Sequence, residues 1–509
     1  MNKTACFTAF LCGSVMALAM PPFSFAFFLF VGLSVFYNLL AERKGWRAFL
    51  LGWLFGFGYF AAGLYWIGNA LLVPGNPFKW VWPLAIAGLP IGLGIFTGLA
   101  CYAATRLADL KTWTGFFVFA ACLMASELLR GHIFTGFPWN LYGYGWAGHL
   151  PMAQSVALIG TYGLTALTIL WAALPGFLFA IRAPRKIVSL SLLVLITSLN
   201  IVYMTGAHRL STHPTKYRDD VMVRIVQPDI LQEDKWDSEE LARNLERTVA
   251  DSTGDFMAGK TYAVVWPETA VSDYILQDEN AGGFIRSSLF KPGRKAYLIS
   301  GVLRHAQGAN GKPLYYNSLM ALDTRLAPVS SYDKSHLVPF GEYIPYQDII
   351  PMNPFVNFSG FTPGPGIGTE SVGELPPYSG LVCYEVIFPG AAALKSPRPE
   401  WIVNVTNDAW YGDSPGPYQH LTKAVFRAIE EGLPLARSAN TGISAMIDPY
   451  GRILKTISYG QNGAIDVPLP YPARQLTGYG NYRDSPLFAA ISVVFCFAFF
   501  GMRRNKSSH

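Results

Sequence analysis

Two kinds of hydrophobic pattern divide the chain. From residue 1 to about residue 203, long apolar runs dominate and charged residues are sparse. A helix needs roughly 20 apolar residues to cross the hydrocarbon of a bilayer. The long runs therefore predict eight membrane-spanning helices, at residues 5–20, 22–41, 47–69, 82–105, 114–129, 155–181, 187–206 and 486–502.

The region from 217 to 470 has a different pattern, with short apolar runs separated by turn residues and ordinary charge density. Short runs rich in β-branched and aromatic residues predict strands. These runs are 221–227, 262–266, 296–302, 318–323, 380–383, 401–405, 444–447 and 453–456. Helical periodicity at 238–252 and 418–431 lies between them, so we predict an α/β domain whose sheets are covered by helices.

Composition supports a membrane protein with a water-soluble domain. The 509 residues are 51% hydrophobic and only 14% charged, which is too apolar for a purely soluble chain. We expect seven helices in 1–210, a soluble domain in 217–470 and a last membrane helix in 486–503. The net charge is +6, but the soluble part contains no run of basic residues and no basic helix. Nucleic-acid binding is therefore not expected.

The basic residues of the short loops predict the orientation. Lysine and arginine gather on the inner side of membrane proteins. With the N-terminus inside, the inner segments hold Lys3, Arg43, Lys44, Arg47, Arg106, Lys111, Arg182, Arg185, Lys186, Arg503, Arg504 and Lys506. The outer loops hold few, among them Lys79 and Arg130. Seven spans then place the soluble domain outside, in the periplasm of a bacterium, and the last helix returns the C-terminal tail to the cytoplasm.

One cysteine lies outside the predicted spans. Cys383 ends a short apolar strand and precedes a sharp turn into what reads as a helix. The start of a helix favours a thiolate, so this position suits a nucleophile, although a free cysteine is also commonly a small buried hydrophobe. The cysteines and histidines lack metal-ligand spacing, so we expect neither a metal nor a cofactor.

Two further segments carry catalytic residue types after predicted strands. In Val264-Val265-Trp266-Pro267-Glu268, a proline stops the strand and a carboxylate follows it. In Tyr332-Asp333-Lys334-Ser335-His336-Leu337-Val338-Pro339-Phe340-Gly341-Glu342, Lys334 and Glu342 stand among apolar residues. Taken singly, each segment also has an ordinary structural explanation, as a solvated carboxylate or a structural loop.

Together, three ordered segments resemble the Glu-Lys-Cys triad of the nitrilase, or carbon-nitrogen hydrolase, superfamily. They are Trp-Pro-Glu, Lys-x-His-Leu-Val-Pro-Phe-Gly-Glu and Cys-Tyr-Glu. The chain also resembles the membrane-anchored branch of that superfamily, the apolipoprotein N-acyltransferases. This resemblance rests on the membrane spans and on two further segments, Thr135-Gly136-Phe137-Pro138-Trp139 and Thr406-Asn407-Asp408-Ala409-Trp410-Tyr411-Gly412. The resemblance implies an αββα sandwich on an eight-helix base. It also implies an enzyme of the inner membrane that transfers an acyl chain from a phospholipid to the amine of a diacylglyceryl-cysteine apolipoprotein.

The chemistry of such a transfer assigns roles to the triad. Cys383 is expected to be the nucleophile that forms a thioester, Glu268 the base and Lys334 the neighbouring cation that stabilises the oxyanion. Supporting or oxyanion roles are expected for Glu342, Tyr384 and Glu385. Candidate substrate contacts are Trp236, Tyr343, Trp410, Trp139 and Arg130.

Two alternatives fit the same residues. A membrane-tethered amide hydrolase would use the triad and let water resolve the acyl-enzyme, and an inactive lipid-binding scaffold would not use it. The seven spans before the domain favour the transferase over a soluble type of hydrolase. A monomer is expected.

Overall fold

The structure, a computed structural model, describes residues 2–74, 77–235, 237, 239–308, 311–345 and 360–507, with side chains described up to residue 500. The chain forms two compact units. One comprises residues 1–68, 81–213 and 478–509, and the other comprises residues 69–80 and 214–477. The short segment 69–80, between two helices of the first unit, therefore belongs with the second.

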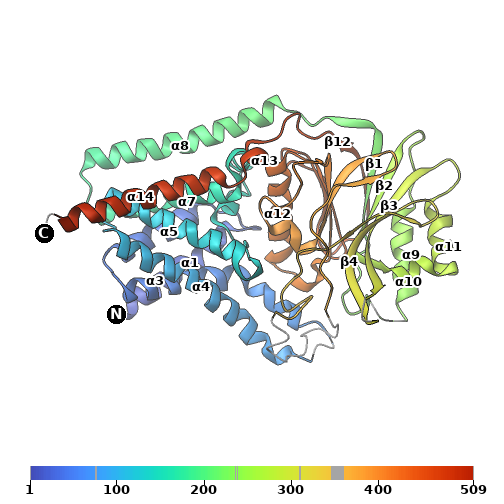
Figure 1. Cartoon of the computed structure of the whole chain (residues 1–509), viewed down its shortest axis with the longest axis horizontal. Helices are drawn as coiled ribbons and strands as arrows, with labels where there is room; N and C mark the ends of the chain where they lie inside the picture. Colours follow the sequence, from blue (N-terminus) through green and yellow to red (C-terminus); the bar gives the residue numbers. More distant parts are fainter. Residues whose placement is uncertain are drawn as a thin grey trace. The chain divides into compact units, whose positions relative to one another are not determined.

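The first unit is helical (Figure 1). Its α-helices are α1 (Lys3–Met16), α2 (Phe27–Ala41), α3 (Trp46–Leu64), α4 (Trp82–Leu107), α5 (Trp113–His132), α6 (Leu150–Ala153), α7 (Val156–Ala180), α8 (Arg185–Thr212), α13 (Gly478–Tyr482) and α14 (Ser485–Ser507). Short 3-10 segments occur at Ala17–Ala19, Tyr65–Leu71, Lys79–Val81, Ile133–Thr135 and Tyr142–Trp146, the second and third of which extend into residues 69–80.

Five helical segments within the described ranges are long and apolar enough to cross a membrane. They are Trp46–Leu71, Lys79–Leu107, Trp113–Thr135, Val156–Ala180 and Arg185–Thr212. Three shorter apolar helices, at Lys3–Ala19, Phe27–Ala41 and Ser485–Phe500, occupy the places of the other predicted spans. A membrane region with five candidate spans is therefore established, and the full set of eight stays a prediction.

Small residues let these helices pack closely. A Cβ added at Gly56 of α3 would lie 3.0 Å from the Cα of Gly94 in α4, and one at Gly94 would lie 2.9 Å from the carbonyl oxygen of Trp53. Between apolar helices in lipid, close backbone approach is a main source of stability, because lipid tails compete with any hydrophobic contact. Alanine at either position would force α3 and α4 apart.

The second unit contains two six-stranded sheets. The first has the order β12-β1-β2-β3-β4-β5 and the second β11-β10-β9-β8-β7-β6. The strands of the first sheet are β1 (Tyr217–Gln227), β2 (Thr261–Ser272), β3 (Lys295–Gln307), β4 (Pro313–Leu322), β5 (Pro328–Asp333) and β12 (Gly463–Pro470). The strands of the second are β6 (Glu370–Val372), β7 (Leu375–Val382), β8 (Trp401–Thr406), β9 (Leu435–Ala439), β10 (Ser444–Ile447) and β11 (Ile453–Ile457).

Alternation along the strands builds the layers. Val265 of β2 packs in a core shared with Val403 of β8 and Ala436 of β9, so the two sheets face each other. Its neighbour Val264 points to the opposite face, where it packs with residues of the helices that cover the first sheet. The predicted α/β sandwich is therefore confirmed.

Helices cover both outer faces of the sandwich. On the first sheet these are α9 (Leu241–Ser252), α10 (Asp273–Gln277) and α11 (Glu279–Leu289), and on the second it is α12 (Pro415–Glu431). Figure 1 shows α9, α10 and α11 on one side of the strands and α12 on the other. Two 3-10 turns, η6 (Cys383–Ile387) and η7 (Asp408–Tyr411), follow strands β7 and β8.

Four strands escaped the sequence pattern, for identifiable reasons. β5 and β6 lie at the edges of their sheets, where polar residues such as Ser330 and Ser331 are tolerated. β12 is also an edge strand and contains Pro468 and Pro470, which argue against a central strand. β9 is buried throughout but carries Arg437, whose charge breaks the apolar run.

Candidate active site

Cys383 lies where strand β7 ends and the η6 turn begins. Its φ is +51°, a left-handed conformation that is uncommon for a residue with a side chain. Such a conformation costs about 1–3 kcal/mol and persists only where the surroundings hold it. The side chain is buried, and Thr406 hydrogen bonds to it from the end of the neighbouring strand β8. The strand end and sharp turn predicted at Cys383 are thus present, but the segment that follows is a five-residue 3-10 turn and not the helix expected there.

Glu385 ties this elbow to the segment that follows β5. Its Oε2 accepts a hydrogen bond from the Val382 N–H at 2.8 Å. Its Oε1 accepts bonds from the N–H groups of Ser335 at 2.9 Å and His336 at 3.0 Å, and from the Tyr332 hydroxyl at 2.6 Å. One carboxylate therefore fixes the residue before Cys383 and the residues directly after Lys334.

A buried polar network lies against the other side of the elbow. Nε2 of His420 lies 3.2 Å from the carbonyl oxygen of Cys383, and its Nδ1 lies 2.8 Å from Oδ1 of Asp408. Arg437 donates to Oδ2 of Asp408 at 2.7 Å. Burial alone would raise the pKa of Asp408, but Arg437 and His420 hold it below its ordinary value. The sequence reading missed these roles, although Asp408 lies in a segment that it had singled out.

Glu268, Lys334 and Glu342 form one buried charge cluster. Nζ of Lys334 lies 2.8 Å from Oε2 of Glu342 and 3.8 Å from Oε1 of Glu268. Asn317 of β4 donates through Nδ2 to both carboxylates, at 2.7 Å to Glu268 and 3.0 Å to Glu342. The N–H of Lys334 also donates to the Asn317 carbonyl at 2.8 Å. Asn317 therefore aligns all three charges, and no motif in the sequence pointed to it.

Burial and mutual charge set the protonation of this cluster. Burial raises the pKa of Glu268, and the charge of Lys334 opposes the rise. Burial by itself would lower the pKa of Lys334, but the carboxylates of Glu342 and Glu268 raise it above its ordinary value. Lys334 is therefore a permanent cation at neutral pH, shared between two carboxylates.

The thiol of Cys383 belongs to the same electrostatic system. Burial raises its pKa, the carboxylate of Glu268 raises it further, and Lys334 lowers it. The resting thiol therefore keeps its proton near neutral pH and needs a base to become a nucleophile. Glu268 is a carboxylate whose raised pKa improves it as that base.

The other predicted residues lie in several places. The ring of Tyr384 contacts the rings of His336 and Phe388 at centroid distances of 5.7 and 5.2 Å. Tyr343 and Trp410 are half-buried. Trp236 lies outside the described residues. Their contacts with substrate stay predictions.

Arg130 and Trp139 lie in the helical unit and contact one another. Arg130 forms a buried ion pair with Glu127 and donates to the carbonyl oxygens of Phe137 and, at 2.9 Å, Trp139. The ring of Trp139 is buried against Trp66 at a centroid distance of 5.0 Å. The buried Arg130 side chain therefore holds the 137–139 segment against α5. A contact with substrate remains a prediction for both residues.

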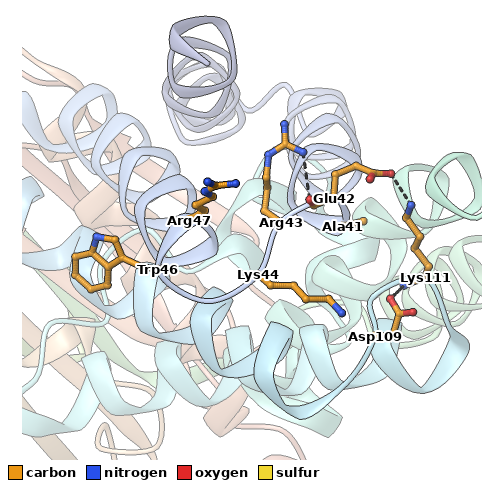
Figure 2. A pocket seen from close by; sticks show the side chains of 8 residues that line it. All are labelled: Ala41, Glu42, Arg43, Lys44, Trp46, Arg47, Asp109 and Lys111. Atoms are coloured by element: carbon orange, nitrogen blue, oxygen red, sulfur yellow. Dashed lines mark hydrogen bonds and ion pairs between the residues drawn. The ribbon is translucent and has the colours of Figure 1, made fainter. Parts of the chain in front are cut away.

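A second cluster of charged residues lines an open pocket in the helical unit. The pocket has a volume of about 690 Å³ and lies between the α2–α3 turn and the α4–α5 turn. Figure 2 shows Arg43, Lys44, Arg47 and Lys111 around it, with the carboxylate of Glu42 bound to Lys111. Within the described part of the chain, His, Cys, Asp and Glu side chains form no cluster suited to a metal ion.

Comparisons with known proteins agree with both units. Residues 12–204 match the apolipoprotein N-acyltransferase N-terminal domain, and residues 222–478 match the carbon-nitrogen hydrolase family. An apolipoprotein N-acyltransferase of Rhodopseudomonas palustris is 38% identical over 505 residues, which cover 96% of this chain and 93% of that protein.

The chain is also similar to a second full-length relative and to a solved structure. An apolipoprotein N-acyltransferase of Bradyrhizobium diazoefficiens is 38% identical over 514 residues, which cover 98% of this chain and 94% of that protein. An amidase structure from Nesterenkonia sp. has 20% identity and a TM-score of 0.38, and covers 55% of this chain and 98% of that chain. On the identity and coverage of the full-length relatives, the chain belongs to the apolipoprotein N-acyltransferase family.

Proposed function

We propose that this protein moves an acyl chain from a phospholipid to the N-terminal amine of a diacylglyceryl-cysteine apolipoprotein through a thioester on Cys383. The observation that carries the proposal is the coupling of the Cys383 thiol to the buried Glu268–Lys334 pair. Acyl transfer from an ester needs a nucleophile, a base and a positive group for the oxyanion. Full-length relatives named for this activity supply the substrate class.

The first half of the reaction follows from these three side chains. Sγ of Cys383 attacks the ester carbonyl carbon while Glu268 takes the thiol proton. The carbonyl oxygen gains negative charge next to Lys334 and the N–H groups of the η6 turn. The C–O bond then breaks, Glu268 returns the proton to the leaving alkoxide, and a lysophospholipid departs from the thioester.

The second half uses the same groups in the same order. The amine of the apolipoprotein attacks the thioester carbonyl, and Glu268 accepts a proton from the nitrogen. The C–S bond breaks, the amide is released, and the proton on Glu268 returns to the thiolate. Glu342 stabilises Lys334 by a direct ion pair throughout. The net reaction converts an ester and an amine into an amide and an alcohol.

The membrane arrangement belongs to the same proposal. Eight helices anchor the chain in the bacterial inner membrane, and the α/β unit lies on the periplasmic side. Support comes from the apolar helices and from the basic residues of the short loops. A monomer is the proposed active form.

A two-substrate assay tests the proposal. Purified full-length protein is mixed with phospholipid and a synthetic diacylglyceryl peptide, and products are identified by mass. We expect an N-acylated peptide, a lysophospholipid and, without peptide, a hydroxylamine-sensitive acyl adduct on the protein. Cys383→Ala and Glu268→Gln should remain folded and form neither adduct nor product.

The alternatives give different results in the same assay. Free fatty acid without N-acylated peptide would identify a hydrolase. The thioester would be contradicted if the wild-type protein formed no adduct, or if the adduct persisted in Cys383→Ala. The lipid-binding scaffold would then be the remaining alternative.

A further inference from the structure

A second buried lysine approaches the proposed base from another direction. Lys235 lies between β1 and α9, and only 6% of its surface is exposed. Its Nζ donates to the main-chain carbonyl oxygen of Glu268 at 2.9 Å. Lysine is almost never fully buried unless its charge is compensated. Neither the mechanism above nor any sequence motif uses this residue.

The carbonyl that Lys235 binds lies on an irregular part of strand β2. The pairing of β2 with β3 shifts register between Trp266 and Val271, and Thr269 has a φ of +46°. Gly301 of β3 makes room for this bulge, because a Cβ there would lie 2.4 Å from the Pro267 carbonyl oxygen. A bulge re-aims a side chain, so the position of the Glu268 carboxylate depends on what holds the bulge.

Lys235 is also part of the charge balance of the site. Burial lowers its pKa to about 8, and the negative charges of Glu268 and of an ionised Cys383 oppose that fall. Within the described part of the chain, the other side chains that line the space around it are uncharged, among them Ile230, Asn244, Pro267 and Asn440. Glu268 in turn faces Lys334 and Glu342.

We infer that Lys235 is a positioning residue for the acyl transfer, because it holds the bulge that presents Glu268 and places a second positive charge behind that carboxylate. The inference rests on the proposed function for its reaction and on the structure for its geometry. Lys235 acts from behind the carboxylate and does not itself touch the reacting carbonyl. Removal of its charge should leave the thiol in place, raise the pKa of Glu268 and free the bulge that aims the Glu268 carboxylate.

The inference predicts a limit to activity at alkaline pH. A lysine with a lowered pKa is charged below that pKa and neutral above it. The support that Lys235 gives to Glu268 is therefore complete near neutral pH and is lost as the pH rises through about 8. The rate of Cys383 acylation should fall over the same interval.

Single-turnover acylation of Cys383, measured by intact mass between pH 6 and pH 10, tests these statements. Lys235→Met should slow acylation about 10- to 100-fold at pH 7, as expected for a misplaced catalytic group, and abolish the fall near pH 8. Lys235→Arg keeps a charged donor and should move the fall to higher pH. Lys291→Met, a matched change at an exposed lysine, should match the wild type.

A second readout separates this inference from the proposed function. Alkylation of Cys383 by iodoacetamide in the full-length protein needs no lipid substrate. A nearby cation favours the thiolate, so Lys235→Met should move the pH midpoint of this alkylation upward. If the wild type transferred no acyl chain but this shift occurred, only the proposed function would fail. Lys235→Met with unchanged acylation and alkylation profiles would overturn the inference. If Lys235→Met did not fold, Lys235→Arg would serve as the test. The inference would be overturned if the alkaline fall in the acylation rate of Lys235→Arg lay at the same pH as in the wild type.

Discussion

The two charged clusters of this protein contain the same residue types in opposite surroundings. In the α/β unit, the side chains of Lys334 and Glu342 are 1% and 12% exposed and lie 2.8 Å apart. In the pocket of the helical unit, those of Lys111 and Glu42 are 40% and 55% exposed and lie 2.6 Å apart. The exposed pair is therefore the shorter of the two.

Burial, and not distance, separates their expected effects. Water screens the exposed pair, and pairs of that kind contribute about 0–1 kcal/mol. A buried pair has lost its water, so removal of one partner leaves an uncompensated charge at a cost of about 3–5 kcal/mol. The same loss of water moves the pKa values of Glu268 and Cys383 upward and makes proton transfer between them useful.

The largest expected effect comes from matched lysine substitutions in the two clusters. Lys334→Met should lower the free energy of unfolding by about 3–5 kcal/mol and reduce acyl transfer at least about 1,000-fold, because Glu268 and Glu342 lose their shared cation. Lys111→Met should change stability by less than about 1 kcal/mol and leave activity intact. Unfolding in detergent measures the stability of each variant, and the two-substrate assay measures its activity. Equal losses of stability and activity in the two variants would contradict the difference proposed between the clusters.

A smaller effect is expected behind the elbow. His420→Ala should reduce acylation of Cys383 about 10- to 100-fold, because the ring no longer contacts the carbonyl of a residue held at positive φ. His305→Ala removes a histidine that is 2.6 Å from Asp273 but partly exposed, and should leave acylation unchanged. Single-turnover intact mass measures the rate, and wild-type acylation in His420→Ala would show that η6 holds its conformation alone.

Asn317 should determine the acid limit of the reaction. Glu268 must be ionised to accept a proton, so the rate rises with pH through its pKa, which burial has raised. The Asn317 hydrogen bond opposes this rise, so Asn317→Ala should move the acid limb to higher pH. Asn280→Ala, on the surface of α11, is the control in the same pH series. An acid limb that moved downward, or not at all, would mean that another group titrates there.

The smallest effect is expected in the open pocket. Lys44→Met removes an exposed cation, and such substitutions usually change stability by less than about 0.5 kcal/mol. Thermal unfolding and the transfer rate should therefore match the wild type. A large loss of stability would show that the pocket charges are coupled as tightly as those around Lys334.

Local patterns in the sequence were enough to predict the architecture in outline. Long apolar runs are typical of membrane helices, and most of the predicted strands were found because short runs rich in β-branched and aromatic residues stand between turn residues. The strands that escaped prediction were edge strands, whose polar residues resemble a loop, and β9, where Arg437 is buried against Asn404 of β8 and Asp408 of η7. The local pattern along the chain cannot reveal such partners, because segments distant in the sequence supply them.

The candidate site divides in the same way. By itself, the sequence determined the order of the three segments that carry Glu268, Lys334 and Cys383, and the strand-end elbow at Cys383, since these depend on neighbouring residues. Only the tertiary structure decided that Asn317 aligns the charges, that His420 supports the elbow and that Lys235 reaches Glu268. The physical reason is that burial and electrostatic coupling arise between strands far apart in the chain, where water is excluded only after the sheets have packed.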